Sequence, residues 1–488
     1  MEFIAENLPL FMFAALAVLL FSGYPVALVL GGIGLFFGFI GIYFDEFVFV
    51  QFRAMSSRVF GIEENIILTA IPMFIFMGTM LERSGVARDL LNCLQVLLRR
   101  VPGGLALSVT IMGTILAATT GIIGASVVMM SLLALPIMIE RNYSAPLATG
   151  TIAASGTLGI LIPPSIMLVI MADLLERSVG NLFVAAVFPG LILSGLYMIY
   201  IIVYGSLKPE VAPPLAADIG PQSRAGVWMM VVRSFVPPVF LIFLVLGSIL
   251  AGWATPTEAA GVGAFGAFFL ALINLVLLPG LGVREMHFEG EAQADFDDHS
   301  VGGGFAAELK HFWSVLSDVV QRTALTNAML FGIFIGATLF AYVFRALGGD
   351  DLVIELVDAL GLESWGLLFL ILGIVFFLGF FFDWIEITLI VLPVFSPVIE
   401  LLDFGTHVDK FEVIYWFAIL MAVNLQTSFL TPPFGFALFY MKAVAPPSVK
   451  IEQIYLGIIP FVILQLVGLA AVVMFPDIAL WLPRVLLN

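Results

Sequence analysis

The chain has 488 residues, of which 61% are hydrophobic and only 11% are charged. Soluble domains are about 45–50% apolar and about 25% charged, so this composition excludes an ordinary soluble protein. Uninterrupted apolar runs of about 17 or more residues exclude a β-barrel and predict an all-α polytopic membrane protein. The formal net charge of −16 gives no reason to expect a nucleic-acid partner, and the single cysteine, Cys93, forms no internal disulfide.

The first hundred residues are expected to hold three spans and two amphipathic helices. Residues 8–43 are apolar except at 22–25, which predicts two helices joined by a tight turn. Residues 47–62 are amphipathic and are expected at the membrane interface. A span over 66–81 and an arginine-rich amphipathic arm over 83–100 follow.

The next apolar run, residues 104–139, is interrupted near its centre by the sequence TTGIIGAS at 119–126. Each half has about 15–17 residues, which is marginal for a full crossing of about 20 residues. We interpret the run as a re-entrant hairpin with its tip at 121–126, the alternative being two short ordinary spans.

The apolar run over 145–172 is long enough to cross a bilayer, but it contains features hostile to a helix. Gly156 and Gly159 weaken the helix, and Pro163 and Pro164 remove two backbone donors and clash with the preceding turn. In lipid, a broken helix survives only inside protein or beside a water-filled cavity. The sequence therefore predicts a functional interruption here.

A series of connecting elements separates this region from a second set of interrupted segments. In the middle of the chain we expect a span over 183–204, a polar connector over 206–225, spans over 227–251 and 257–279, and a solvated glycine-rich acidic loop over 281–310. Beyond it we expect a span over 324–346, an amphipathic stretch over 350–360, a hairpin over 365–400 interrupted at 382–388, a Pro-Pro break over 429–435, and an apolar segment over 454–484.

The second half therefore repeats the order of elements in the first: span, arm, broken hairpin, Pro-Pro helix and span. Residues 78–81 align with 336–339 at an offset of 258, and 161–164 align with 430–433 at an offset of 269. Between the equivalent first helices, near 66 and near 324, five full spans intervene, an odd number, because re-entrant hairpins return to their own side and add no crossing. The two halves are thus expected to be inverted repeats, an architecture of alternating-access carriers.

Charge predicts the orientation of the chain. With the N-terminus outside, most of the 19 basic residues fall on the cytoplasmic side, as the positive-inside rule requires. The basic residues left outside are Arg53, Arg58, Arg177, Arg345, Lys410 and Arg484.

Helix ends freed at the interruptions are suited to bind ions. A half-helix N-terminus presents N–H groups and partial positive charge, which favour a carboxylate, whereas a C-terminus presents carbonyls, which favour Na⁺. Nearby hydroxyls add oxygen ligands. The candidate ion- and substrate-binding residues are Thr119, Thr120, Gly121, Gly124, Ser126, Gly156, Thr157, Gly159, Pro163, Pro164, Ser165, Asp383, Glu386, Thr388, Asn424, Gln426, Thr427, Ser428, Thr431, Pro432 and Gly435.

Asp383 and Glu386 are the two acids inside the interruption of the second hairpin. An acid at mid-membrane costs roughly 2.5–3.5 kcal/mol on insertion scales, so such residues are usually functional. Asp383, with Glu386, either supports a cation site or caps the helix that restarts there. Asn424 and Gln426 either bond the freed backbone of the second break or contact substrate. Glu258 fits a structural acid at a helix N-terminus.

Enzymatic chemistry has little support in the sequence, and no catalytic residue is predicted. The four histidines lie outside the apolar runs, and no H-E-x-x-H or G-x-S-x-G motif occurs. The absence of a Gly-Lys dipeptide excludes a Walker A loop in this chain. A membrane enzyme or a channel is therefore less favoured than a carrier.

Several stretches resemble the large permease subunit of TRAP transporters, the DctM type, in its longer-chain branch. The most specific are 150–165, 182–190, the ATPTEAA sequence at 254–260 and the NLQTSFLTPPFG sequence at 424–435. The resemblance covers nearly the whole chain. It implies a bacterial or archaeal inner-membrane carrier that takes up organic acids (dicarboxylates, 2-oxoacids or sugar acids) with a Na⁺ gradient.

The resemblance also implies a division of labour and partners. A scaffold and a transport domain moving as an elevator are expected, together with a small four-helix membrane subunit (DctQ type) and an extracytoplasmic binding protein (DctP type). Na⁺ is the implied coupling ion, with no other cofactor, held near Gly121, Ser126, Gly156, Asp383 and Thr431. The alternative is a stand-alone Na⁺- or H⁺-coupled anion carrier without a binding protein.

The expected domains follow from the repeat and from the resemblance. They are N-terminal scaffold helices over 1–62, repeat 1 over 63–205, a connector with scaffold helices over 206–280, the acidic loop over 281–310, and repeat 2 over 311–488.

Overall fold

The computed structural model describes residues 7–215, 220–280, 305–432 and 435–486, without the side chains at 118–120, 397 and 400. The regular structure of these residues is entirely helical. Among them, eight helices are long and apolar enough to cross a membrane, or up to ten if each of two bent pairs is one span. The protein is therefore a multi-pass helical membrane protein, as its composition predicts.

The N-terminal elements follow the predicted order. They are α2 (Leu8–Leu20), α3 (Val26–Tyr43), α4 (Gln51–Glu63), η1 (Ile67–Thr69), α5 (Ala70–Arg83) and α6 (Val86–Leu98). The turn between α2 and α3 contains Gly23, whose φ of 81° lies in the left-handed region that favours glycine. Residues 89–96 of α6 are all buried, so the predicted arm packs into the protein on all sides over two turns.

The first interrupted segments form short helices. These are α7 (Gly104–Thr120), α8 (Ile123–Glu140), α9 (Ala145–Thr157), η2 (Leu158–Ile160) and α10 (Ile166–Leu174), followed by α11 (Val179–Leu207). The interruption between α7 and α8 is only Gly121 and Ile122, which is shorter than the predicted 119–126. Gly121 alone adopts a positive φ, 57°, which is enough to end α7.

The helices in the middle of the chain follow one another with few breaks. They are α12 (Arg224–Met230), η3 (Val231–Phe235), α13 (Val236–Leu250), α14 (Pro256–Leu272), η4 (Ile273–Leu277), α15 (Leu278–Gly280) and α16 (Phe305–Ala346). Thr255 and Glu258 form a capping box at the start of α14, which confirms the structural role predicted for Glu258.

The acidic segment differs from the prediction at its C-terminal end. Residues 281–304 lie outside the described residues, but 305–310 belong to α16 and are not loop. Phe305, Ala306 and Ala307 begin the helix without a glycine or proline to stop it, and Glu308 in the first turn suits the helix dipole.

The remaining elements complete the second half. They are α17 (Gly349–Leu360), α18 (Ser364–Leu378), α19 (Trp384–Leu401), α20 (Val413–Leu430), α21 (Phe436–Val444), α22 (Ile451–Met474) and α23 (Asp477–Leu486). The second hairpin is interrupted at 379–383, earlier than predicted, because Asp383 caps α19 and makes 384–388 helical. The last apolar segment is two helices, because Pro476 cannot continue α22.

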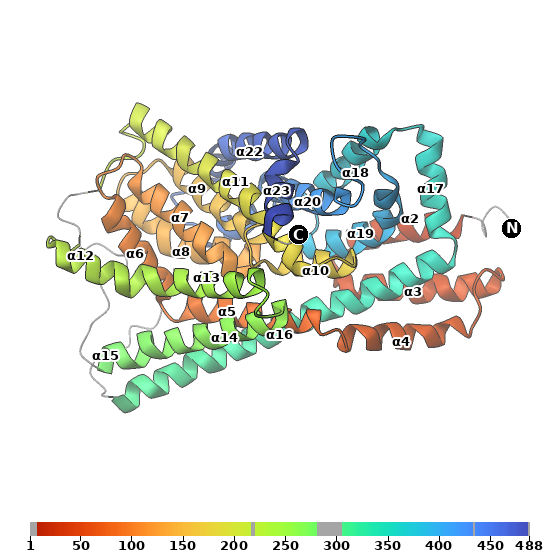
Figure 1. The fold of residues 1–488 in the computed structure, drawn as a ribbon, viewed down its shortest axis with the longest axis horizontal. Coiled ribbons are helices and arrows are strands. Elements are labelled where there is room, and N and C mark those ends of the chain that lie inside the picture. Colours follow the sequence, from red (N-terminus) through yellow and green to blue (C-terminus); the bar gives the residue numbers. More distant parts are fainter. Residues whose placement is uncertain (1–6, 216–219, 281–304, 433–434, 487–488) are drawn as a thin grey trace.

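Two groups of helices pack closely through glycine. In the first group α16, the long helix along the lower side of Figure 1, packs against α3, α4 and α5. A Cβ atom on Gly34 of α3 would lie 3.1 Å from the Leu339 carbonyl carbon, and one on Gly336 would overlap the Ala27 carbonyl. Small residues at such crossings let membrane helices approach to backbone contact.

The second group is built around α9 and α22, which pack against each other (Figure 1). A Cβ atom on Gly457 of α22 would overlap the Pro146 carbonyl, and one on Gly150 of α9 would overlap the Gly457 carbonyl. The helix that leads into the first Pro-Pro break is therefore held against a helix of the second half.

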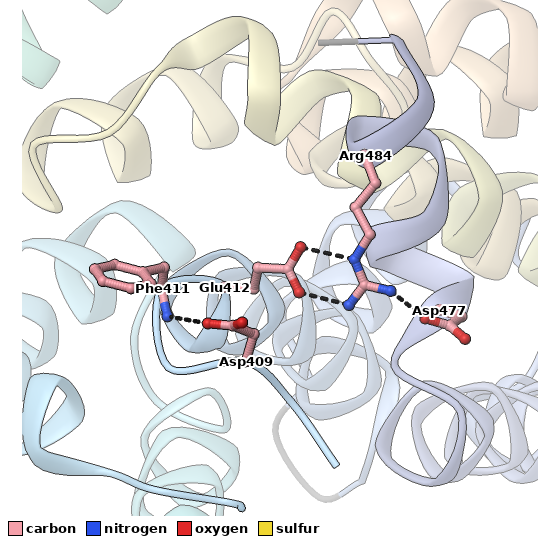
Figure 2. Close-up of polar contacts among 5 residues, drawn as sticks. All are labelled: Asp409, Phe411, Glu412, Asp477 and Arg484. Atoms are coloured by element: carbon pink, nitrogen blue, oxygen red, sulfur yellow. Dashed lines mark hydrogen bonds and ion pairs between the residues drawn. The ribbon is translucent and has the colours of Figure 1, made fainter. Parts of the chain in front are cut away.

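The C-terminal helix α23 is fixed to the segment before α20 by one arginine. Figure 2 shows the Arg484 guanidinium bonded to both carboxylate oxygens of Glu412 and, through Nη1, to Asp477 at 2.7 Å. Hydrogen bonding to Glu412 raises the pKa of Arg484 above its usual range. Because the group is largely exposed, the bidentate geometry orients α23 more than it stabilises the fold.

The glycine contact between α3 and α16 leads to a stability prediction. Gly336→Ala should destabilise the protein by about 1–3 kcal/mol, because the added methyl overlaps backbone that cannot rotate away. Thermal unfolding of the detergent-purified protein measures the loss. Gly332→Ala is the matched control one turn earlier, where the new Cβ would sit 3.7 Å from the Ala27 Cβ. Equal melting temperatures for both variants would contradict the prediction.

Candidate functional site

Each interrupted hairpin is closed at its open end by a hydrogen bond. In the first, the Leu105 amide at the start of α7 donates to the Tyr143 hydroxyl beyond α8, at 3.2 Å. In the second, the Asp403 amide beyond α19 donates to Ser364 Oγ at the start of α18, at 3.0 Å. Both pairs are therefore antiparallel helical hairpins whose interruptions lie at the far ends.

The first Pro-Pro break is a true interruption of the helix, and it is buried. Helix α9 ends at Thr157, one 3-10 turn follows, and the helix resumes only at Ile166. All residues from 156 to 165 are buried, including Gly159, Pro163 and Pro164. Ser165 Oγ donates to the Ile160 carbonyl at 2.7 Å and so satisfies one carbonyl that the break frees.

The second break has the same form. Helix α20 ends at Leu430, Pro432 is not helical, and α21 begins at Phe436; Pro433 lies outside the described residues. A Cβ atom on Gly435 would lie 2.6 Å from the Phe429 carbonyl oxygen, so only glycine fits beside the end of α20.

The hairpin tips lie against the breaks of their own halves. A Cβ atom on Gly121 would lie 2.8 Å from Ile166, where the helix resumes after the first break. A Cβ atom on Gly379 would overlap the side chain of Ser428, in the last turn before the second break. The structure therefore brings four segments, predicted separately from the sequence, into two tip-and-break pairs.

A side-chain hydrogen bond joins the two tip-and-break pairs. Gln426 Nε2, in α20, donates to the Thr157 carbonyl at the end of α9 at 3.0 Å. Nearby on α20, Asn424 Nδ2 donates to the Leu372 carbonyl of α18 at 2.7 Å. Both amides thus bond the main chain of other helices, not the freed backbone of the second break as predicted. Their contact with substrate stays a prediction.

Asp383 occupies the N-cap of α19. Its Oδ1 accepts the Trp384 amide at 2.8 Å, and Glu386 Oε2 accepts the Asp383 amide at 3.3 Å, completing a capping box. The capping interpretation is therefore realised in the geometry. A carboxylate has about four lone-pair sites, so one that accepts these amide bonds retains others for a cation.

The hydroxyl groups of the site mostly bond to their own helices. Ser126 donates to the Ile122 carbonyl, Thr157 to Ala154, Thr427 to Val423 and Thr431 to Thr427, at 2.7–3.1 Å. Such bonds turn hydroxyl protons toward the helix, which leaves oxygen lone pairs directed away from it. The side chains of Thr119 and Thr120 lie outside the described residues.

Three buried polar atoms near these segments have no hydrogen-bond partner among the described residues. They are Thr388 Oγ1 and Trp384 Nε1 of α19, and Gln426 Oε1 of α20. All three side chains are at most 1% exposed. Buried polar atoms are rarely left unpaired in native proteins, and an unpaired one points to a bound water or ion.

Tyr440, which is not among the residues predicted from the sequence, lies against the first hairpin tip. A Cβ atom on Gly124, beside the first tip, would lie 2.8 Å from the Tyr440 ring. Because α21 begins directly after the second break, this ring brings the second break next to the first tip. A tyrosine four residues after the start of α21 carries no sequence signal of its own, because its position follows only from the packing of α21 on α8.

The contact of Gly379 with Ser428 predicts how the second tip responds to a methyl group. Gly379→Ala should push the tip off α20 and raise amide hydrogen exchange at 379–384 and 428–431. Gly373→Ala, in α18 before the tip, meets nothing within 4 Å and should leave exchange unchanged. Gly379→Ala combined with Ser428→Gly should restore protection. Unchanged exchange in the single variant would mean that the tip is not seated on α20.

The comparisons with known proteins agree over almost the whole chain. The family model described as "Tripartite ATP-independent periplasmic transporter, DctM component" matches residues 13–478. The C4-dicarboxylate TRAP transporter large permease protein DctM of Pseudomonas aeruginosa is 29% identical over 432 residues, which are 88% of this chain and 90% of that protein. The ectoine TRAP transporter large permease protein TeaC of Halomonas elongata is 26% identical, over 96% of this chain and 98% of that one.

A solved structure shares the fold. The YdaH transporter of Alcanivorax borkumensis matches with a TM-score of 0.58 at 14% identity, over 96% of this chain and 98% of the other. The family model covers far more than half of the residues, including both hairpins and both Pro-Pro breaks. The chain therefore belongs to the DctM family of TRAP transporter large permease subunits.

Proposed function

We propose that this protein is the large membrane subunit of a binding-protein-dependent symporter that uses a Na⁺ gradient to take up an organic acid across a bacterial or archaeal inner membrane. The observation that carries the proposal is the joined pair of helix breaks, the first buried and the second half-buried at residues 431 and 432, each with a hairpin tip against it. Main-chain groups freed at mid-depth need partners. A bound Na⁺ can pair with the freed carbonyls, and the carboxylate of a bound organic acid can pair with the freed amides.

The polarity of the helix ends supports both ligands. Helices α9 and α20 end at the breaks with their carbonyls, which suit a hard cation such as Na⁺. Helices α10 and α21 begin there with their amides, which suit a carboxylate. Asp383 and the hydroxyl oxygens add ligands to the cation on the side of the hairpin tips. Na⁺ is accordingly expected near Gly121, Ser126, Gly156, Asp383 and Thr431.

The names of the relatives support an acidic substrate without selecting one. They include transporter subunits named for C4-dicarboxylate, for ectoine and for isethionate, and the sialic acid transporter subunit SiaM of Vibrio cholerae, which is 25% identical. Each of these compounds carries a carboxylate or a sulfonate. Backbone amides can hydrogen-bond such an acid group without contacting the rest of the molecule, so the substrate class is an organic acid.

Two partners complete the proposed assembly. The family description speaks of a tripartite transporter, and a relative in Oleidesulfovibrio alaskensis is named DctMQ, with 58% of its length matching this chain. These names support a small membrane subunit of the DctQ type and an extracytoplasmic binding protein of the DctP type. The charge distribution supports an N-terminus outside the cytoplasm.

The two glycine-packed groups support an elevator movement. The group around α3, α5 and α16 would be the scaffold, and the hairpins with α9, α20 and α22 would move as the transport domain. In this proposal the hairpins are re-entrant and the two halves are inverted repeats, so that one body carries both breaks across the membrane.

Uptake by reconstituted vesicles tests the coupling ion and the partners. Proteoliposomes containing both membrane subunits should accumulate labelled C4-dicarboxylate or sialic acid when the matching binding protein and an inward Na⁺ gradient are supplied. Accumulation driven by a proton gradient and indifferent to Na⁺ would refute Na⁺ coupling. Equal uptake without the binding protein would favour the stand-alone carrier.

Two substitutions at Asp383 distinguish its role as a helix cap from its proposed role as a cation ligand. Asn is as good an N-cap as Asp, so Asp383→Asn should fold normally yet reduce Na⁺-driven uptake by roughly tenfold to a hundredfold, as expected for a lost charged contact. Asp383→Ala should in addition lose about 0.5–2 kcal/mol of stability. Glu258→Gln removes a carboxylate from the capping box at the start of α14 and is the control. Full uptake per folded Asp383→Asn molecule would leave Asp383 only a cap.

A further inference from the structure

The hydrogen bond between the two breaks joins equivalent positions of the two halves. Residues 161–164 align with 430–433 at an offset of 269, and the same offset relates Thr157 to Gln426. Equivalent residues of two inverted halves can touch only close to the axis that relates them. The bond from Gln426 Nε2 to the Thr157 carbonyl therefore marks the centre of the site, where the two breaks face each other.

The chemistry of this contact fixes the orientation of the amide. A carbonyl only accepts hydrogen bonds, so the amide nitrogen must face Thr157 and the amide oxygen must point elsewhere. Gln426 is fully buried, and its Oε1 has no partner among the described residues. Gln426 thus donates through Nε2 to the first break, and its Oε1 stays able to accept a hydrogen bond from, or to coordinate, an occupant of the site.

Helix α20 is also held on its other side. Asn424, two residues before Gln426, donates to the Leu372 carbonyl of the second hairpin. The last turns of α20 are therefore anchored to the second hairpin and to the end of α9, and the helix ends one turn later, at Leu430. A shift of the Thr157 carbonyl must move Gln426, and with it the carbonyls that line the second break.

We propose that Gln426 is a positioning residue that couples the two breaks, so that a cation bound at one lowers the ordering cost of binding at the other. This inference rests on the proposed Na⁺ symport. Ordering one break fixes the amide, and the amide then holds the other break in its binding geometry. Sites coupled in this way bind with positive cooperativity.

Na⁺ titration of thermal stability tests the coupling without transport. The complex of large and small subunits, purified in detergent, is unfolded at increasing NaCl with choline chloride keeping the ionic strength constant. The wild-type midpoint temperature should rise with a Hill coefficient above 1. Gln426→Met keeps the size but cannot donate, so its Hill coefficient should fall to about 1, with half-saturation at roughly threefold to tenfold higher Na⁺.

A matched control removes the same kind of contact elsewhere. Asn274 Nδ2 donates to the Ser84 carbonyl at 2.7 Å, another buried amide that bonds the main chain of a different element. Asn274→Leu should lower the midpoint temperature at every Na⁺ concentration and leave the Hill coefficient at its wild-type value. A fall in the coefficient in this variant would show that any lost amide has the effect, and would overturn the inference.

A second variant covers the case in which Gln426→Met does not fold. In Gln426→Glu the protonated side chain can donate to the Thr157 carbonyl and the ionised one cannot, so the Hill coefficient should fall as the pH rises. A coefficient unchanged from wild type in both variants would overturn the coupling role and leave Na⁺ symport intact. No response of the wild type to Na⁺ would instead overturn the coupling ion, and the inference with it.

Discussion

The structure depends on one constraint: in a hydrocarbon environment every main-chain N–H and C=O must find a partner inside the protein. Most of the chain meets it with continuous helix. At the two Pro-Pro breaks it cannot, because proline removes donors and ends the helix. The first break is therefore buried under other helices, and the second is half-buried at residues 431 and 432. Side chains beside the first break, Ser165 and Gln426 among them, hydrogen-bond its carbonyls.

The same constraint explains where glycine is needed. A side chain can reach a freed carbonyl only if the helices lie close together, and glycine allows this at the points of closest approach. Gly379 lets the second tip reach the end of α20, and Gly150 with Gly457 sets α9 against α22. In each case an added Cβ would overlap atoms of the neighbouring element, so these glycines determine which helices pack together.

The site is asymmetric although its two halves correspond. The second half contributes a glutamine at the position where the first half has a threonine, and the glutamine bonds the main chain of the first. Likewise the second tip carries Asp383 and Glu386, whereas the first tip, 121–126, carries no acid. A symmetric framework with one-sided polar groups suits two ligands of opposite charge.

The sequence alone determined the class of protein, the order of its helices and the two breaks, because apolar runs and prolines act locally. It also predicts Asp383, Gln426 and the glycines Gly121 and Gly124 as site residues, and this part stays a prediction. It misjudged the interruptions by a few residues, since a cap or a single left-handed glycine decides where a helix stops. Only the tertiary structure decided that Gln426 meets Thr157, that Gly379 meets Ser428 and that Tyr440 lies against the first tip. Those contacts join residues that no local pattern relates, and they arise from how the helices pack.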